Sequence, residues 1–373
     1  HDGDFNDEGE GPNAAAAGVD LQGVDVALAL HMETTATGGR ALPRSWLSLK
    51  ATADSATEVG IPFMSLQASA MAIDINAGTA GDNVVDLKAG KALSVATGDG
   101  NQTVTLDFDS ARGTQVKASA AFILNIADFV TASGTLGFER SLRDVVLADG
   151  TKAKTEMLTF GGENLHAFVG LNGPADGIYN ASSHPDAMGL ALTDVDFALA
   201  LFSARAGETA SKGLKWAAVK ATAGSVEVVG MPELTLAARN LSLDLNLVDT
   251  TGFGRPVNGD NKVIDFAGGG GTRKLDVVTG TGRSTAITFD GGLGEYIRAT
   301  GDVELLVGDF FAVKGSLGFE RRVQDVTLAD GSLVKTQLIS IGGSCAARAK
   351  KCSTNISQSE PRAARSSQTM AST

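Results

Sequence analysis

The sequence has 373 residues but few cysteines and aromatic residues. It has 2 cysteines, and both Cys345 and Cys352 lie near the C-terminus, so the long preceding part is not held together by disulfides. A body without cysteine is common in exported bacterial proteins. Aromatic residues make up 5% of the chain and glycine occurs 46 times, a composition more typical of a repetitive β-protein with many turns than of a pocketed enzyme.

The sequence also has little positive charge and no long apolar run. The formal net charge is −12 and no cluster of lysine and arginine occurs in the body, which argues against nucleic acid as a partner. No apolar run reaches the length of a membrane span, so no membrane span is expected. There is no signal peptide, and the chain begins inside a repeat-like segment, so we expect a fragment of a longer protein located outside the cell or on its surface.

One unit occurs twice. GVDLQGVDVALAL at 18–30 returns as GLALTDVDFALAL at 189–201, and SGTLGFER at 133–140 returns as KGSLGFER at 314–321. A duplication of this length indicates two copies of one module. We therefore expect an acidic loop at 1–17, a first module at 18–171, a linker at 172–188, a second module at 189–343 and a disordered, non-repeat tail at 344–373.

Alternation with a period of two residues dominates both modules. Apolar side chains recur at every second position in segments 24–30, 66–75, 103–108 and 241–247, which predicts strands with one buried face. Asp-Gly pairs after such runs predict tight turns. Segments 214–229 and 295–307 are long for a compact sandwich. The prediction is an all-β fold, either an extended β-solenoid or a long-stranded β-meander, with the pairing direction left open.

The repeat unit resembles a known class of module. An acidic, Gly-rich opening is followed by PNAAAAG at 12–18, an alternating VDVALAL strand, GTLGFER and a LADG turn. This pattern, which covers residues 1 to 343, looks like the long repeat modules of giant exported bacterial proteins grouped as RTX-type and adhesin-like. The resemblance implies an extracellular location, calcium-loaded loops between neighbouring repeat modules and a structural or adhesive role with a cell-surface or protein partner.

The N-terminal segment is a candidate calcium site. Its oxygen-bearing side chains alternate as in the first half of an EF-hand loop, with two further carboxylates close by: Asp2, Asp4, Asn6, Asp7 and Glu8. The match is incomplete, because an acidic residue replaces the glycine at the sharp turn and Asn13 stands where the last carboxylate is expected. A solvated acidic loop is the alternative interpretation.

A catalytic site would have to be assembled from scattered residues. His166 and His184 are the candidate general bases of a hydrolase acting on esters or glycosides, but no metal-binding histidine spacing and no Gly-x-Ser-x-Gly motif occurs. A lone histidine in a loop is more often solvated than catalytic. Glu139 and Glu320 occupy identical Phe-Glu-Arg contexts a module apart, and we interpret them as cross-strand ion-pair partners or sheet-edge charges.

The two tryptophans allow a third interpretation. Trp46 and Trp216 occupy equivalent positions of the repeat, and exposed indole rings would provide stacking platforms for a glycan, as in a carbohydrate-binding β-module. Their apolar neighbours Leu47, Leu49 and Val219 favour core anchors instead.

Overall fold

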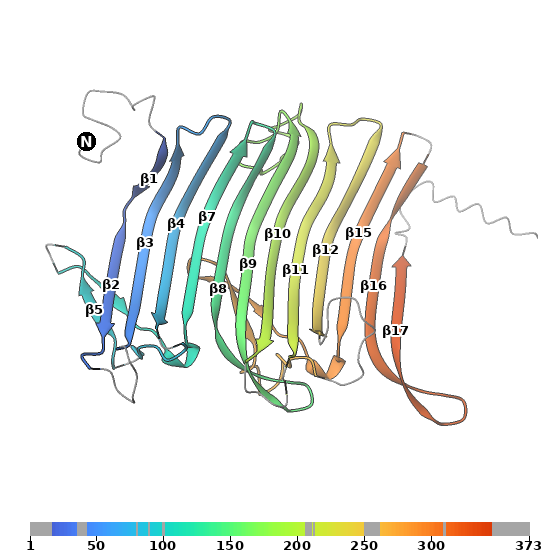
Figure 1. Cartoon of the computed structure of the whole chain (residues 1–373). Helices are drawn as coiled ribbons and strands as arrows, with labels where there is room; N and C mark the ends of the chain where they lie inside the picture. Colours follow the sequence, from blue (N-terminus) through green and yellow to red (C-terminus); the bar gives the residue numbers. More distant parts are fainter. Residues whose placement is uncertain are drawn as a thin grey trace, which may run out of the picture.

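The computed structural model describes residues 17–35, 43–79, 81–88, 90–98, 101–205, 211, 213–249, 262–308 and 311–344. These residues form a broad antiparallel sheet and two small hairpins (Figure 1), which confirms the all-β prediction. The strands are β1 (Gly18–Gln22), β2 (Asp25–Met32), β3 (Ser45–Val59), β4 (Met64–Gly78), β5 (Leu93–Ala96), β6 (Thr103–Leu106), β7 (Gln115–Ile126), β8 (Val130–Val146), β9 (Lys152–Leu171), β10 (Met188–Ala204), β11 (Lys215–Val229), β12 (Leu234–Asp249), β13 (Leu275–Gly280), β14 (Arg283–Ile287), β15 (Tyr296–Val307), β16 (Phe311–Thr327) and β17 (Leu333–Ser344).

The main sheet has 13 strands and follows the chain in order, interrupted only where β5–β6 and β13–β14 leave it to form separate hairpins. Neighbouring strands pair antiparallel, which answers the question of direction that the sequence left open. The sheet does not close, so β1 and β2 lie along one edge and β17 lies along the other (Figure 1). The sheet is continuous across the expected linker, because β9 and β10 pair from Met188 opposite Leu171 to Ala204 opposite Thr155.

The alternation of side chains gives the sheet two different faces. In β2 and β10 the alanines point to one face, where Ala27 and Ala198 are buried beneath the two hairpins. We call this side the hairpin face. The leucines between the alanines point to the opposite side, the open face, where Leu28 and Leu30 are largely exposed. Small side chains on the hairpin face therefore let a second layer approach the sheet closely.

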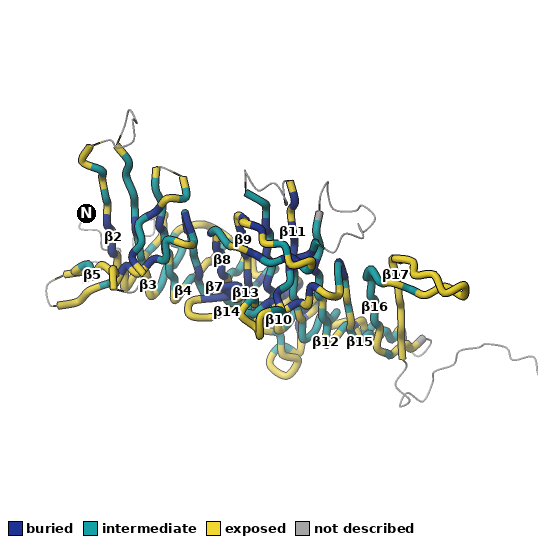
Figure 2. The backbone as a smooth tube through the Cα atoms, turned by 90° about the horizontal axis from the view of Figure 1, so that it is seen from below, coloured by how far each residue is buried: buried dark blue, intermediate teal, exposed yellow. Residues whose placement is uncertain are grey.

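The larger hydrophobic core lies where β13–β14 crosses strands from both expected modules. Leu147 after β8 and Met157 of β9 pack in one cluster with Phe202 of β10, Trp216 of β11 and Val277 of β13. The buried residues gather around the middle strands, whereas β17 is mainly exposed (Figure 2). Hairpin β13–β14 therefore joins strands of the two expected modules through one core.

Two glycines mark the closest approach of this hairpin to the sheet. A Cβ atom at Gly137 of β8 or at Gly161 of β9 would lie 2.4 or 2.3 Å from the carbonyl oxygen of Val278. Such distances do not occur between real atoms, so a larger residue at either position would force the hairpin and the sheet apart.

The two halves use the same contacts at equivalent positions. The indole N–H of Trp46 donates to the carbonyl oxygen of Asn83, and that of Trp216 donates to Lys262, both at 2.7 Å. After each hairpin a short 3-10 helix follows: η1 (Ser110–Arg112), capped by Asp109, and η2 (Gly291–Leu293), capped by Asp290. The part of the chain that the structure describes contains no helix long and apolar enough to span a membrane.

Candidate functional site

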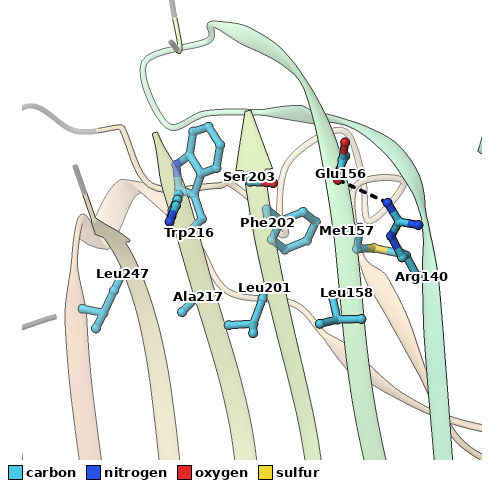
Figure 3. Close-up of a pocket in the computed structure, with 11 residues that line it drawn as sticks. Arg140, Glu156, Met157, Leu158, Leu201, Phe202, Ser203, Trp216, Ala217 and Leu247 are labelled. Carbon is cyan, nitrogen blue, oxygen red and sulfur yellow. Dashed lines mark ion pairs between the residues drawn. The ribbon is translucent and has the colours of Figure 1, made fainter. Parts of the chain in front are cut away.

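A cavity of about 420 Å³ lies beside Trp216, at the ends of β8 to β12 (Figure 3). Cross-strand register places its walls, because Phe202 lies opposite both Trp216 and Met157, and Leu201 lies opposite Leu158. Cross-strand aromatic pairs such as Phe202 and Trp216 stabilise strand ends. The apolar lining therefore combines three residues of the larger core, Met157, Phe202 and Trp216, with residues outside it: Leu158, Leu201, Ala217 and Leu247.

Charged groups lie at the rim of this cavity. Arg140 and Glu156 form an ion pair, with 3.6 Å between Nη2 and Oε2, and both side chains are about half exposed (Figure 3). Lys215 also lines the opening. An exposed pair of this kind contributes little to stability. The arrangement can hold an apolar group beneath a charged rim.

An equivalent cavity of about 430 Å³ lies beside Trp46 at the edge of the sheet. Leu30, Met32 and Trp46 line it, and the Arg44 guanidinium lies 5.2 Å from the centre of the indole ring. One face of the Trp46 ring is therefore occupied by a cation, and Trp216 is only 2% exposed. Trp216 therefore belongs to the buried core, whereas Trp46 is half-buried and lies outside the core clusters of the described residues.

Asp265 connects the segment before β13 to η2. Its carboxylate accepts hydrogen bonds from the backbone N–H groups of Ala267, Gly268 and Gly291 and from the guanidinium of Arg273. Burial raises the pKa of Asp265, but the hydrogen bonds together lower it by more than burial raises it. The net pKa therefore lies below the usual value. The carboxylate is therefore a structural tie in its ionised form.

A buried tyrosine closes the same core. Tyr296 packs edge-to-face on Phe289, with ring centres 5.5 Å apart, and burial raises the pKa of its hydroxyl group. Its phenol therefore stays protonated at neutral pH.

His166 lies on β9 and is engaged by a single residue. The backbone N–H of Asp194 donates to Nδ1 at 3.4 Å, and Nε2 lies 3.5 Å from Oδ1 of the same aspartate. Ser133 is the cross-strand neighbour of His166, but both ring nitrogens face Asp194. A base that activates a serine directs one ring nitrogen at the hydroxyl group, and this geometry does not provide that.

His184 lies in the loop between β9 and β10. Its backbone N–H donates to the carbonyl oxygen of Asn180 at 2.9 Å, and its Nδ1 is buried without a hydrogen-bond partner among the described residues. The structure therefore places the two candidate bases in different surroundings and shows no shared constellation around them in the described segments.

The candidate calcium ligands Asp2, Asp4, Asn6, Asp7 and Glu8 lie outside the described residues, as does the tail from Cys345 onward. Within the described ranges, no group of three or more histidine, cysteine, aspartate or glutamate side chains is arranged to hold a metal ion. The calcium hypothesis stays a prediction.

The cavity beside Trp216 was not predicted from the sequence. Met157, Phe202 and Leu247 come from three strands, and their meeting depends on strand register, which alternation alone does not define. In the sequence, only the equivalent positions of Trp46 and Trp216 in the repeat indicated where the two cavities lie.

Comparison with protein-family models, with curated proteins and with solved structures finds no match to the chain.

Proposed function

We propose that the chain is a structural or adhesive repeat segment of a large exported bacterial protein, located outside the cell or on its surface. The observation that carries this proposal is the junction between the two halves. There, β9 and β10 continue one sheet, and the hairpin β13–β14 clamps strands on both sides of the junction. A unit that buries its core against its neighbour is the hallmark of repeat arrays.

The open face supports the adhesive side of this proposal. Apolar side chains including Leu28, Ile73, Phe160 and Leu243 are each more than one third exposed. Their strands belong to one sheet. Exposed apolar surface marks interaction sites, so a cell-surface or protein partner, or a glycan, would bind there.

The first test is thermal unfolding with and without millimolar calcium, run beside a panel of chromogenic esters and glycosides. A calcium-dependent rise in Tm without turnover is the expected result, because a ligand that binds only the folded state stabilises it. Calorimetry of an Asp2→Ala/Asp4→Ala variant provides the matched control, and calcium heats equal to those of the unmodified chain would remove the calcium site.

Turnover of a chromogenic substrate would remove the structural role and favour a hydrolase. His166→Ala and His184→Ala then identify the base. Quenching of tryptophan fluorescence by soluble glycans would instead favour a carbohydrate-binding β-module, and Trp46→Phe would locate that site.

A further inference from the structure

The strands that carry hairpin β13–β14 have counterparts in the second half that are exposed. Leu147, in the LADG turn after β8, is 1% exposed, whereas Leu328 in the matching turn after β16 is 48% exposed. Ala153 at the start of β9 is 1% exposed, and Val334 at the equivalent position of β17 is 40% exposed. The hairpin face of β15–β17 therefore repeats the docking surface of β7–β9, and neither of the two described hairpins covers it.

The glycines that admit the hairpin are repeated as well. Gly318 and Gly342 stand where Gly137 and Gly161 stand in the first half. A Cβ atom at Gly342 would meet nothing within 4 Å, and one at Gly318 would meet only Thr300, at 4.0 Å. The second half thus keeps a surface shaped for the close approach of a hairpin backbone.

A matching hairpin is exposed at the other end of the sheet. Hairpin β5–β6 covers β2 and projects beyond this edge strand (Figures 1 and 2). Leu93 of β5 is 37% exposed, whereas its counterpart Leu275 of β13 is 1% exposed. Ala96 is also exposed, while the equivalent Val278 is buried against the sheet.

The cavity beside Trp46 shows the same incompleteness. In the cavity beside Trp216, Met157 and Leu158 of β9 and Arg140 of β8 form one wall. The Trp46 cavity is lined from β2, β3 and the end of β4, and no described strand lies beyond β2 to provide this wall.

We propose that a second copy of this chain completes both surfaces by docking head to tail. Hairpin β5–β6 of one copy lies on the hairpin face of β15–β17 of the other, and β2 pairs with β17. Docking of a second copy gives the proposed structural role a partner and a surface, and the inference rests on that role. The internal β9–β10 junction is the template, so the contact continues an interface that the molecule already contains.

The template also gives the register of the new strand pair. Within the chain, Leu199 lies opposite Phe160 and Leu201 lies opposite Leu158. The equivalent residues place Leu28 of one copy opposite Ile341 of the other, and Leu30 opposite Ile339. These residues are exposed in the single chain, and an exposed apolar edge strand is a template for pairing with another chain.

Such a contact joins two different surfaces and leaves one of each free in every complex. Further copies can therefore add one after another as their concentration rises.

The test is sedimentation velocity of the full chain over about 1 to 200 µM, a range in which contacts of moderate affinity appear. Two variants each block one surface. Gly342→Leu fills the place that the Ala96 carbonyl of the donor hairpin would take, and Ala96→Arg charges the tip of that hairpin. Each should weaken association by about 10- to 100-fold, because overpacking an interface is costly.

Mixing the two variants decides between head-to-tail docking and other contacts. Each variant keeps one intact surface, so an equimolar mixture should form a dimer that grows no further. Gln67→Ala, which changes an exposed side chain on β4 away from β2, β17 and both hairpin surfaces, is the control and should assemble like the unmodified chain. Unchanged circular dichroism and Tm at low concentration show that the variants fold.

A chain that stays monomeric over the whole range would overturn the proposal, as would association that survives in both variants or a mixture that forms no dimer. The assay contains no calcium, glycan or substrate. A negative result therefore leaves the structural or adhesive role standing, whereas turnover of a chromogenic substrate would remove that role without affecting assembly.

Discussion

Replacing Gly161 by alanine tests the hairpin packing, and Gly342 provides the matched position. The same substitution at these equivalent glycines meets different surroundings. At Gly161 the added Cβ lies 2.3 Å from the Val278 carbonyl oxygen, and at Gly342 nothing lies within 4 Å. Neither glycine has a φ in the left-handed region, so backbone strain does not distinguish them.

The expected cost follows from how firmly β13 is held. To reach an ordinary contact distance, the hairpin must move away from the sheet by about 1 Å, which costs about 1–3 kcal/mol in a packed interior. The movement is opposed by the hydrogen bond from Thr279 to Glu163 and by the register of β13 with β14. At Gly342 the substitution should be neutral or stabilise by up to about 1 kcal/mol, because alanine loses less backbone entropy in a strand.

Thermal unfolding at about 1 µM, where self-association is minimal, measures both effects. The described part comprises about 300 residues, for which the unfolding entropy is about 0.6 kcal/mol/K, so Gly161→Ala should lower Tm by about 2–5 °C. Hydrogen exchange of residues 275–287 should accelerate in this variant and not in Gly342→Ala. Equal Tm values for the two variants would refute the close packing of the hairpin on β9.

Three further predictions concern the core and its ties. Trp216→Phe should destabilise the protein by about 2–3 kcal/mol in urea unfolding, because it removes part of a buried side chain and a hydrogen bond. Trp46→Phe should cost only about 1 kcal/mol, because this ring is half-buried. A cost for Trp46→Phe as large as for Trp216→Phe would contradict the burial difference. Asn246→Ala should cost about 1–3 kcal/mol, because the buried amide donates to the carbonyl oxygen of Ile264 at 3.0 Å; an unchanged urea midpoint would show that the bond is dispensable. Asp265 has a lowered pKa in the folded chain, so its contribution is complete above the ordinary carboxyl pKa and is lost as pH falls below about 4. The Tm difference between the unmodified chain and Asp265→Asn should therefore shrink between pH 5 and about pH 3, and a difference that grows there would contradict this sign.

Local features of the fold could be predicted from the sequence because they depend on neighbouring residues. Alternation at 214–229 and 295–307 predicted strands that the structure shows as β11 (Lys215–Val229) and β15 (Tyr296–Val307). The Asp-Gly turns are also confirmed, since Gly150 and Gly331 adopt φ angles of 83° and 82°.

Contacts between distant elements could not be predicted in the same way. Glu139 was expected to pair across strands, but it is buried and is bound by Arg112 of η1 and by Ser141, whereas Glu320 does pair across strands with Arg298. The Phe-Glu-Arg context is identical, but Leu293 of η2 stands at the position equivalent to Arg112 of η1, so the second half lacks the cation that binds Glu139. Likewise, the residues of β13 (Leu275–Gly280) do not show which strands of the sheet the hairpin covers.

The direction of the strands determines how the molecule responds to tension. The described chain starts at one edge of the sheet and ends at the opposite edge, and the strands run across the line that joins these edges (Figure 1). A pull along this line loads the backbone hydrogen bonds of the edge strands one after another, as a zipper opens, rather than all at once in shear. Hairpin β13–β14 lies across β7 to β10 and ties them together, so peeling from either edge should stop at this clamp. The sheet would therefore lengthen in small steps at low force and keep an intact centre, the mechanical behaviour of an extensible tether.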